Sequence, residues 1–145
     1  MLQVRLAHNG DAAMLFAWRN EETVRQQSFN SDPIDWATHV RWLEMTLASS
    51  DQLICIALEG DKPAGSFRLE KLTDSTVLIS ITVAPMLRGQ GLGSRMLRLA
   101  AEQCRSRFGP VTIVAQIKAD NEASLRAFAK AGYTLRSVTM ELQCD

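Results

Sequence analysis

The sequence predicts a single domain of mixed α and β structure. Segments that alternate apolar and polar residues, as strands do, take turns along the chain with segments whose apolar residues recur at helical spacing. The 145 residues are the usual size of one domain, and no repeat, linker or block of like charge divides residues 1–145. With 46% apolar and 22% charged residues, the composition is that of a globular protein and excludes disordered and collagen-like classes.

Charge and cysteine content exclude further classes. The 16 Lys and Arg balance the 16 Asp and Glu, so net charge gives no general attraction to nucleic acid or to an anionic membrane. The three cysteines have neither zinc-ligand spacing nor the density of a disulfide framework, so we expect reduced thiols and no metal site. No apolar run is long enough to span a membrane, and Met1 to Gly10 lacks the apolar stretch of a secretory signal, which predicts a cytoplasmic protein.

The first half of the chain predicts one strand, two helices and a β meander. Leu2 to Leu6 alternates as a strand does, and Asn9-Gly10-Asp11 supplies turn and capping residues for a helix from Ala12 to Arg19. Ser31-Asp32-Pro33 predicts the start of a second helix, which has His39 on its polar face. The apolar face of this helix carries Trp36, Val40, Leu43 and Leu47. The meander comprises strands from Leu53 to Glu59, from Pro63 to Glu70 and from Val77 to Val83.

The second half predicts helices that alternate with strands. A helix from Gly91 to about Phe108 is closed by Gly109-Pro110, and a second helix from Asn121 to Ala131 ends at Gly132. The strands run from Val111 to Ile117 and from Tyr133 to Leu142. The predicted order is β-α-α-β-β-β-α-β-α-β, with a mixed, mostly antiparallel sheet flanked by helices.

A glycine-rich turn joins the strand that ends at Val83 to the helix that begins near Gly91. The segment reads Val83-Ala84-Pro85-Met86-Leu87-Arg88-Gly89-Gln90-Gly91-Leu92-Gly93-Ser94. Glycines let a backbone approach a ligand closely, and a helix N-terminus presents unpaired N–H groups and partial positive charge, an arrangement that binds phosphate. The alternative is a tight turn without a ligand. The Walker and dinucleotide-binding patterns are both absent, so ATP and NAD are not favoured.

Two motifs in this region resemble the GCN5-related N-acetyltransferase (GNAT) family. The family signature for acyl-CoA is Arg or Gln, two residues, Gly, one residue, and Gly or Ala, which Arg88-Gly89-Gln90-Gly91-Leu92-Gly93 fits. A second match is Asn121-Glu122-Ala123-Ser124-Leu125-Arg126-Ala127-Phe128-Ala129-Lys130-Ala131-Gly132-Tyr133, which is similar to the downstream helix and strand of the family. The resemblance covers Leu53 to Tyr133 and extends to the first 50 residues only through the order of elements.

The resemblance implies acetyl-CoA as co-substrate. The strand from Ile81 to Val83 would pair with the pantetheine arm, amides from Arg88 to Ser94 would hold the pyrophosphate, and Asn121 and Phe128 would line the same cofactor. The implied cofactor-binding residues are Ile81, Val83, Arg88, Gly89, Gln90, Gly91, Leu92, Gly93, Ser94, Asn121 and Phe128.

The first third resembles acetyltransferases that act on nucleotide-linked amino sugars in flagellin and polysaccharide nonulosonic-acid pathways, including pseudaminic acid. The segments that carry this similarity are Trp18-Arg19-Asn20, Val24-Arg25, Ser28-Phe29-Asn30-Ser31 and the helix with His39 and Trp42. The expected substrate-binding residues are Trp18, Arg19, Asn20, Phe29 and Ser80. The aromatic residues are equally expected as core side chains. The first 60 residues carry twice as many acidic as basic side chains, which argues against a diphosphate acceptor.

The usual acid and base of the family are missing. Phe128 stands where relatives often have a tyrosine acid, and Gln116 where some have a glutamate base. Glu70 is the first candidate base, directly or through water, because it ends a strand that borders the expected cleft; the alternative is a solvated turn carboxylate. Positioning of the two substrates is expected to supply much of the rate.

The sequence therefore predicts an enzyme that moves the acetyl group of acetyl-CoA to a primary amine by direct attack. A nucleotide-linked amino sugar is the preferred acceptor. The alternatives are a protein N-terminus, another small-molecule amine, and a non-catalytic sensor of acyl-CoA. No nucleic-acid or membrane partner is expected, and free strand edges favour a homodimer.

Overall fold

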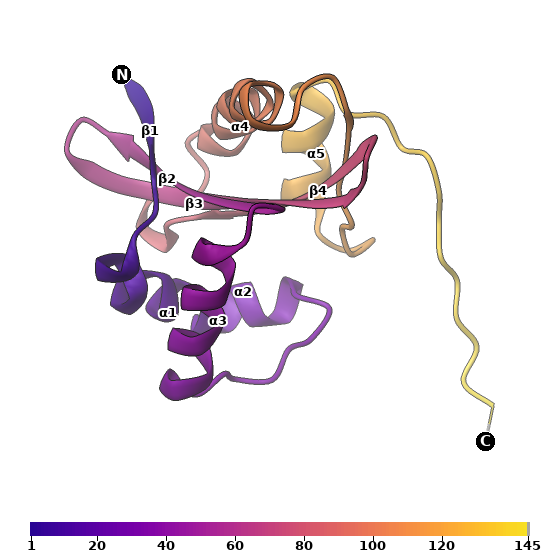
Figure 1. The fold of residues 1–145 in the computed structure, drawn as a ribbon. Coiled ribbons are helices and arrows are strands. Elements are labelled where there is room, and N and C mark those ends of the chain that lie inside the picture. The colour runs from indigo at the N-terminus through magenta and orange to yellow at the C-terminus, as the bar shows by residue number, and fades with distance from the viewer. Residues whose placement is uncertain (145) are drawn as a thin grey trace.

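A five-stranded mixed sheet forms the centre of the computed structural model, which describes residues 1–144 (Figure 1). Its strands are β1 (Leu2–Leu6), β2 (Gln52–Glu59), β3 (Lys62–Thr73), β4 (Thr76–Val83) and β5 (Thr112–Val114), in the order β1-β2-β3-β4-β5. β1 to β4 are antiparallel neighbours, and β5 runs parallel to β4. The predicted fold class, a mixed and mostly antiparallel sheet flanked by helices, is confirmed.

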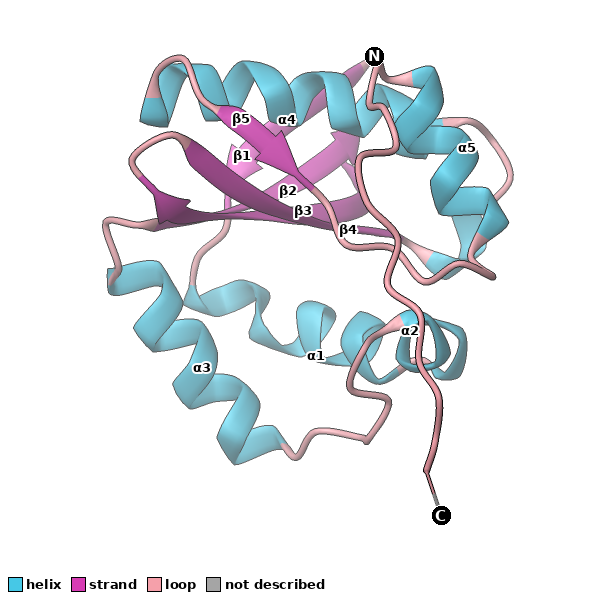
Figure 2. Ribbon diagram, turned by 90° about the vertical axis from the view of Figure 1, so that its right-hand side faces the viewer, coloured by secondary structure: helices cyan, strands magenta, loops and turns pink. Residues whose placement is uncertain are grey.

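Helices cover both faces of the sheet (Figure 2). On one face lie α1 (Ala12–Asn20), α2 (Glu22–Gln27) and α3 (Trp36–Ala48), and on the other lie α4 (Leu92–Phe108) and α5 (Glu122–Lys130). Single turns of 3-10 helix at Asn9–Asp11 and Pro85–Leu87 precede α1 and α4.

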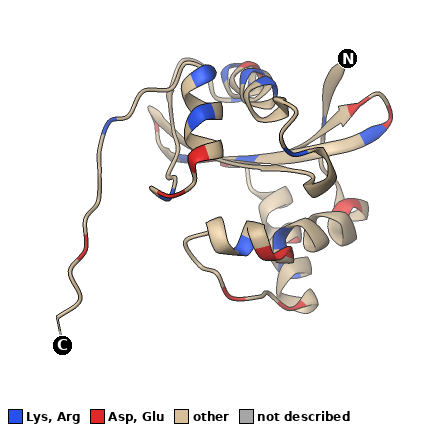
Figure 3. Cartoon of the chain, turned by 180° about the vertical axis from the view of Figure 1, so that it is seen from behind, with Lys and Arg blue, Asp and Glu red and all other residues tan. Residues whose placement is uncertain are grey.

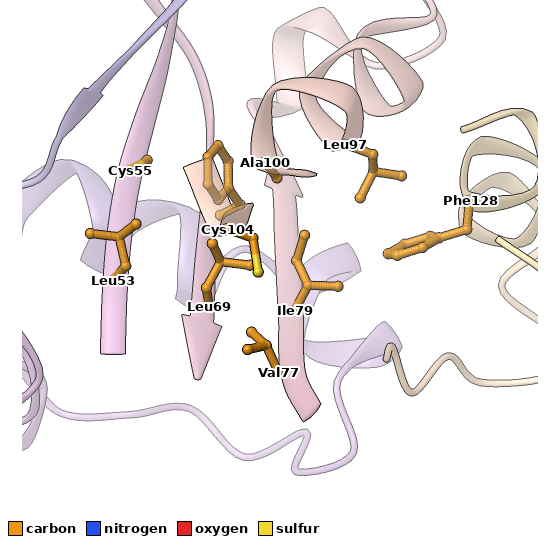
Figure 4. Packing of buried hydrophobic residues seen from close by; sticks show 10 residues of the cluster. Leu53, Cys55, Leu69, Val77, Ile79, Leu97, Ala100, Cys104 and Phe128 are labelled. Carbon is orange, nitrogen blue, oxygen red and sulfur yellow. The ribbon is translucent and has the colours of Figure 1, made fainter. Parts of the chain in front are cut away.

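The two faces of the sheet bury two separate cores. The upper core packs against α4 and α5 (Figure 4) and consists of Leu53, Cys55, Phe67, Leu69, Val77, Ile79, Leu97, Ala100, Cys104 and Phe128. The lower core packs against α1 and α3 and consists of Ala7, Ala12, Leu15, Leu43, Ile54 and Ile56. Successive residues of β2 alternate between the two cores, which explains why this strand is apolar at nearly every position.

The structure corrects the predicted elements before β2. A third helix, α2, stands where the sequence predicted none, because its six residues carry no apolar stripe; the Glu21 carboxylate starts it by accepting a hydrogen bond from Val24 N at 3.1 Å. The following helix begins at Trp36 rather than near Ser31, since Asp35 is its cap and accepts from Thr38 N at 2.9 Å.

Of the two strands predicted after α4, one is shorter than expected and the other is absent among the described residues. The strand expected from Val111 to Ile117 is reduced to Thr112–Val114, and the segment expected to form a strand from Tyr133 to Leu142 has no regular structure. Its apolar side chains Leu135, Val138, Met140 and Leu142 are exposed, and Figure 1 shows this tail running away from the sheet. Alternating apolar residues predict a strand only where a neighbouring edge offers hydrogen bonds, and the tail meets no such edge among residues 1–144.

Candidate functional site

The glycine-rich turn between β4 and α4 requires glycine at two positions. Gly89 and Gly91 adopt φ angles of +79° and +75°, the left-handed region that other residues enter at a cost. Gly91 is also the N-cap of α4, so no side chain caps the first turn of this 17-residue helix. The N–H groups of that turn are therefore available to an anion beside the positive end of the helix dipole. The side chains of Leu92 and Ser94 are buried, so only the backbone of these residues is left for an anion.

β4 and β5 separate along their length. Parallel pairing joins residues 76–78 of β4 to residues 112–114 of β5, and beyond Val114 the chain leaves the sheet. Residues 79–83 of β4 consequently have β3 on one side and no strand on the other. Ile81 and Val83 lie on this free edge, whose peptide groups an extended ligand would satisfy in the same way as a strand.

Helix α5 brings the second motif against the glycine-rich turn. A Cβ atom on Gly93 would lie 3.3 Å from Ala127 Cβ, so the first turn of α4 packs directly on α5. Asn121 is the N-cap of α5 and accepts from Ser124 N at 3.2 Å. Phe128 is buried, with its ring 4.8 Å from that of Tyr133, and Figure 4 shows it pointing from α5 toward Ile79 of β4.

An ion pair ties the glycine-rich turn to the opposite helical layer. Arg88 Nη2 lies 2.8 Å from Glu21 Oε2, although 67 residues separate them. The Arg88 guanidinium is the main cause that lowers the pKa of Glu21 from 4.5 to about 2. Since Glu21 also caps α2, this pair connects the turn to the junction of α1 and α2. The sequence contains no signal for it, because neither residue lies in a motif with the other.

This ion pair predicts a pH-dependent contribution to stability. A carboxylate with a depressed pKa in the folded state stabilises the fold above its ordinary pKa and loses this effect as the pH falls from about 4.5 to about 2. We expect Glu21→Gln to lower the free energy of unfolding at pH 7 and to match the wild type near pH 2. Urea unfolding of both proteins between pH 2 and 7 measures the difference. Glu22→Gln is the control, and an equal effect in that variant contradicts the assignment.

A polar surface covers the face of the sheet next to α1–α3, at the strands β3 and β4. Arg68 and Glu70 alternate with the upper-core residues of β3, and Ser80, which pairs in register with Arg68, is exposed on β4. Glu70 was expected at a strand end, but β3 continues to Thr73, so Glu70 lies inside the strand. Its carboxylate is half-buried and accepts a hydrogen bond from Arg68 Nη1 at 3.1 Å, which corrects the alternative of a solvated turn residue.

The residues expected to bind the acceptor substrate in the first third of the chain have different surroundings. Trp18 packs, partly buried, against the lower core, whereas Phe29 is 69% exposed on the loop after α2. Asn20 uses both ends of its amide on the backbone of Ile34, with hydrogen bonds of 2.9 Å from its Nδ2 to the Ile34 carbonyl and from Ile34 N to its Oδ1. Asn20 thus holds the loop that leads to α3. Arg19 is half-buried, and its guanidinium carbon lies 4.3 Å from the centroid of the Trp42 ring.

His39 is fully buried, which corrects its predicted place on a polar helix face. Its Nε2 donates to the carbonyl of Ala12 at 3.0 Å, which leaves Nδ1 as acceptor for Arg19 Nη1 at 3.4 Å. Burial is the main cause that lowers the pKa of His39, and the nearby Arg19 lowers it further, so the ring is neutral at pH 7.

The buried cysteines agree with a mechanism that has no covalent intermediate on a thiol. Burial raises the pKa of Cys55 to about 11 and also raises the pKa of Cys104, so both stay protonated at neutral pH. Among residues 1–144, no three His, Cys, Asp or Glu side chains are grouped so as to hold a metal ion. In the same range, no helix has the length and apolar character to cross a membrane.

Comparisons with known proteins agree with this geometry. Residues 2–134 match the family model described as an acetyltransferase (GNAT) domain. Similar solved structures include aminoglycoside acetyltransferase AAC(6')-Ib with coenzyme A, with 21% identity over 94% of this chain and 86% of that one and a TM-score of 0.80. Spermidine N-acetyltransferase from Vibrio cholerae, solved with CoA and spermine, has 14% identity over 94% and 82% of the two chains and a TM-score of 0.86.

A further similar structure is a putative acetyltransferase from Salmonella typhimurium with acetyl-CoA, at 22% identity over 94% and 82% of the chains and a TM-score of 0.80. At these identities the structural likeness establishes the fold, and no significant match was found among curated proteins. The family match covers nearly the whole chain, and it confirms the enzyme class predicted from the glycine-rich turn and the Asn121 helix. The chain belongs to the GNAT acetyltransferase family.

Proposed function

We propose that this acetyltransferase moves the acetyl group of acetyl-CoA to a primary amine of a small molecule by direct attack. The observation that carries the proposal is the turn with left-handed Gly89 and Gly91, placed at the end of a β4 edge that is free from residue 79. A diphosphate needs the amides of the turn, and an extended amide-bearing arm needs the free edge. Coenzyme A has both parts in one molecule.

The residues of this region divide into two roles. Backbone groups from Arg88 through Gly89, Gln90, Gly91, Leu92 and Gly93 to Ser94 hold the pyrophosphate, and those of Ile81 and Val83 pair with pantetheine. Asn121 places α5 beside the cofactor, and Phe128 forms an apolar wall near its thioester end. The Arg88 side chain forms an ion pair with Glu21, so it binds the phosphates only if that ion pair breaks.

The proposed reaction does not require a strong proton donor. A neutral amine attacks the thioester carbonyl, a backbone N–H near Val83 stabilises the oxyanion, and the CoA thiolate leaves. Phe128 has no acidic proton to donate, and the amide of Gln116 is too weak a base to accept one. Glu70 is the candidate base. It pairs in register with Leu78, five residues before Val83 on β4, so it receives the amine proton through water rather than directly. Arg68 fixes its carboxylate on the face of the sheet that also bears Ser80. Orientation of the two substrates supplies much of the remaining acceleration.

A nucleotide-linked amino sugar is the preferred acceptor. The segments around Trp18 and Phe29 carry that resemblance, and the exposed ring of Phe29 is free to stack on a base. A different small-molecule amine is the second candidate, because similar solved structures include a spermidine N-acetyltransferase with CoA and spermine and an aminoglycoside acetyltransferase.

Thiol release from acetyl-CoA tests the function directly. The acceptor panel contains UDP-, dTDP- and CMP-linked amino sugars, amino-terminal peptides, polyamines and aminoglycosides. Turnover confined to nucleotide sugars is the expected result. Turnover confined to polyamines, aminoglycosides or peptides would reassign the acceptor. Tight acetyl-CoA binding without turnover on any amine would instead favour the sensor.

A hydroxyl at position 128 tests whether the enzyme lacks an acid that it needs. We expect Phe128→Tyr to leave kcat within a few-fold of the wild type, because a CoA thiolate leaves without protonation and positioning dominates the rate. Single-acceptor kinetics with acetyl-CoA measures the change. Phe108→Tyr, at the end of α4 away from the glycine-rich turn, is the control for an added hydroxyl. A gain in kcat of a hundredfold at position 128 would refute the expectation.

A further inference from the structure

A cavity lies within the helical layer below the sheet and contains two arginines without an acidic partner. Its volume is about 470 Å³, within the range of small-molecule sites. The end of α1, α2, the loop of residues 28–35 and the start of α3 enclose it. Its lining residues are Arg19, Asn20, Arg25, Ser28, Asn30, Asp32, Pro33, Ile34, Asp35 and Thr38.

Arg19 is the unusual member of this lining. Its guanidinium is half-buried, and among residues 1–144 it forms no ion pair. Its neighbours are the face of Trp42, the neutral His39 and the second cation Arg68, whose guanidinium carbon is 5.9 Å from the centroid of the same Trp42 ring. A half-buried charge without an opposite charge is costly, and a bound anion would offset this cost by supplying the partner.

Two arginines and two aspartates line the cavity, and among residues 1–144 no ion pair joins either aspartate to either arginine. Arg25 donates to two backbone carbonyls, those of Asn20 and Ser31, at 3.1 and 3.3 Å and also has no carboxylate partner. Asp35 is occupied as the cap of α3, where it accepts from both the backbone N and the hydroxyl of Thr38 at 2.9 Å. Asp32 lies exposed on the loop. The hydrogen bonds with Thr38 leave the charge of Asp35 in place, so the formal charges of the lining balance, and its distinctive feature is that Arg19 has no direct acidic contact among residues 1–144.

A series of contacts relates Arg19 to the strand that is proposed to hold the thioester. Arg19 stacks on Trp42, Trp42 is next to Arg68, and Arg68 pairs in register with Ser80 of β4. Ser80 directly precedes Ile81 on the free edge. The Arg19 guanidinium therefore lies on the side of α1 that faces this part of the sheet.

We infer that the acceptor carries an anionic group, a phosphate or a carboxylate, and that this group binds to Arg19 in the cavity. The inference rests on the proposed function, because it assigns one end of the same acceptor. It also predicts a preference for anionic acceptors over polycations, because an aminoglycoside or a polyamine offers Arg19 no opposite charge. A nucleotide diphosphate sugar satisfies the requirement, and so does a simple amino acid or an amino sugar phosphate.

Anion binding to the CoA-saturated protein tests the inference without any turnover. CoA occupies the pyrophosphate site, and calorimetry then measures binding of inorganic phosphate, succinate, UDP and spermidine. We expect at least one anion to bind, spermidine to bind more weakly, and Arg19→Met to raise the Kd of that anion roughly tenfold or more. The affinities of phosphate and UDP, compared with that of succinate, show whether a phosphate or a carboxylate supplies the negative charge.

Two further variants make the result specific. Arg41→Met removes an exposed arginine of α3 outside the cavity and should bind the anion as the wild type does. If Arg19→Met fails to fold, Arg19→Gln removes the charge and retains a donor for His39. Absence of anion binding, equal affinity in the Arg19 variant, or tighter binding of spermidine would each overturn the inference.

Kinetics with matched acceptors separates this inference from the proposed function. Glucosamine 6-phosphate and glucosamine share an amine and differ in one anionic group. A kcat/KM at least tenfold higher for the phosphate, lost in Arg19→Met, supports both claims. Anion binding at Arg19 without turnover on any amine would refute the acetyl transfer and keep the anion site, whereas equal turnover of both sugars would keep the transfer and refute the anion requirement.

Discussion

Gly91→Ala should weaken binding of CoA roughly 5- to 30-fold. Alanine in the left-handed region costs about 1–2 kcal/mol, and Gly91 has φ +75° at the cap of α4. The turn escapes this strain by relaxing, which redirects the N–H groups proposed to bind the pyrophosphate, so binding must restore the strained conformation. Gly89, with φ +79°, is expected to behave in the same way, and the double variant should bind more weakly than either. Calorimetric titration with CoA measures each affinity.

The matched control is Gly60→Ala in the turn between β2 and β3. Gly60 has φ +63°, and a Cβ atom there meets nothing within 4 Å, as at Gly91, so the strain and the loss of stability are alike. Only the position differs, because Gly60 lies outside the glycine-rich turn. CoA affinity should be unchanged in Gly60→Ala. A fall in affinity equal to that of Gly91→Ala would show that general destabilisation, and not the shape of the turn, controls binding.

Gly65→Ala is expected to cause the largest loss of stability among the single substitutions considered. A Cβ atom at this buried position of β3 would overlap the carbonyl oxygen of Thr82 and lie 2.8 Å from Met96 Cε. The carbonyl belongs to the backbone of β4 and cannot move without displacing that strand, whereas the buried Met96 side chain can change conformation only within the core. Overpacking of this kind costs about 1–3 kcal/mol or more, which lowers Tm by roughly 3–12 °C in a domain of this size.

The same substitution should also reduce CoA affinity, because β4 and α4 are the elements on either side of the glycine-rich turn. Thermal unfolding and CoA titration of Gly65→Ala measure the two effects. Ser66→Ala, the next position of β3, removes atoms rather than adding them and should change Tm by little. A Gly65→Ala protein with wild-type Tm would mean that β3 and α4 move apart freely at this point.

Figure 3 shows how unevenly charge is distributed over a chain with no net charge. The acidic excess of the first 60 residues argued from sequence against an anionic acceptor. In the folded chain three of those acids form ion pairs with arginines away from Arg19: Asp11 pairs with Arg5, Glu21 with Arg88, and Glu59 with Arg95. Arg19 retains its charge without such a partner. The anion site proposed at Arg19 thus differs in sign from the composition of its segment, because ion pairing is decided between segments.

Local chemistry determined most of the correct predictions. The turn at Gly89 and Gly91, the cap at Asn121 and the alternation in β2 to β4 depend on residues within a few positions of one another, which a sequence shows directly. The wrong strand from Tyr133 to Leu142 and the missed α2 depend on neighbours that are distant in the chain. An alternating segment needs an adjacent edge, and a short polar helix needs contacts that hold it.

The sequence by itself determined the fold class, the glycine-rich turn and the enzyme family, since periodicity and a motif of six residues specify them. Only the tertiary structure decided what each charged side chain meets. It buries His39 under Arg19, joins Arg88 to Glu21 across 67 positions, and fixes Glu70 on Arg68. The physical reason is that electrostatic interaction depends on distance and burial, and both are set by the packing of elements that the linear order leaves far apart.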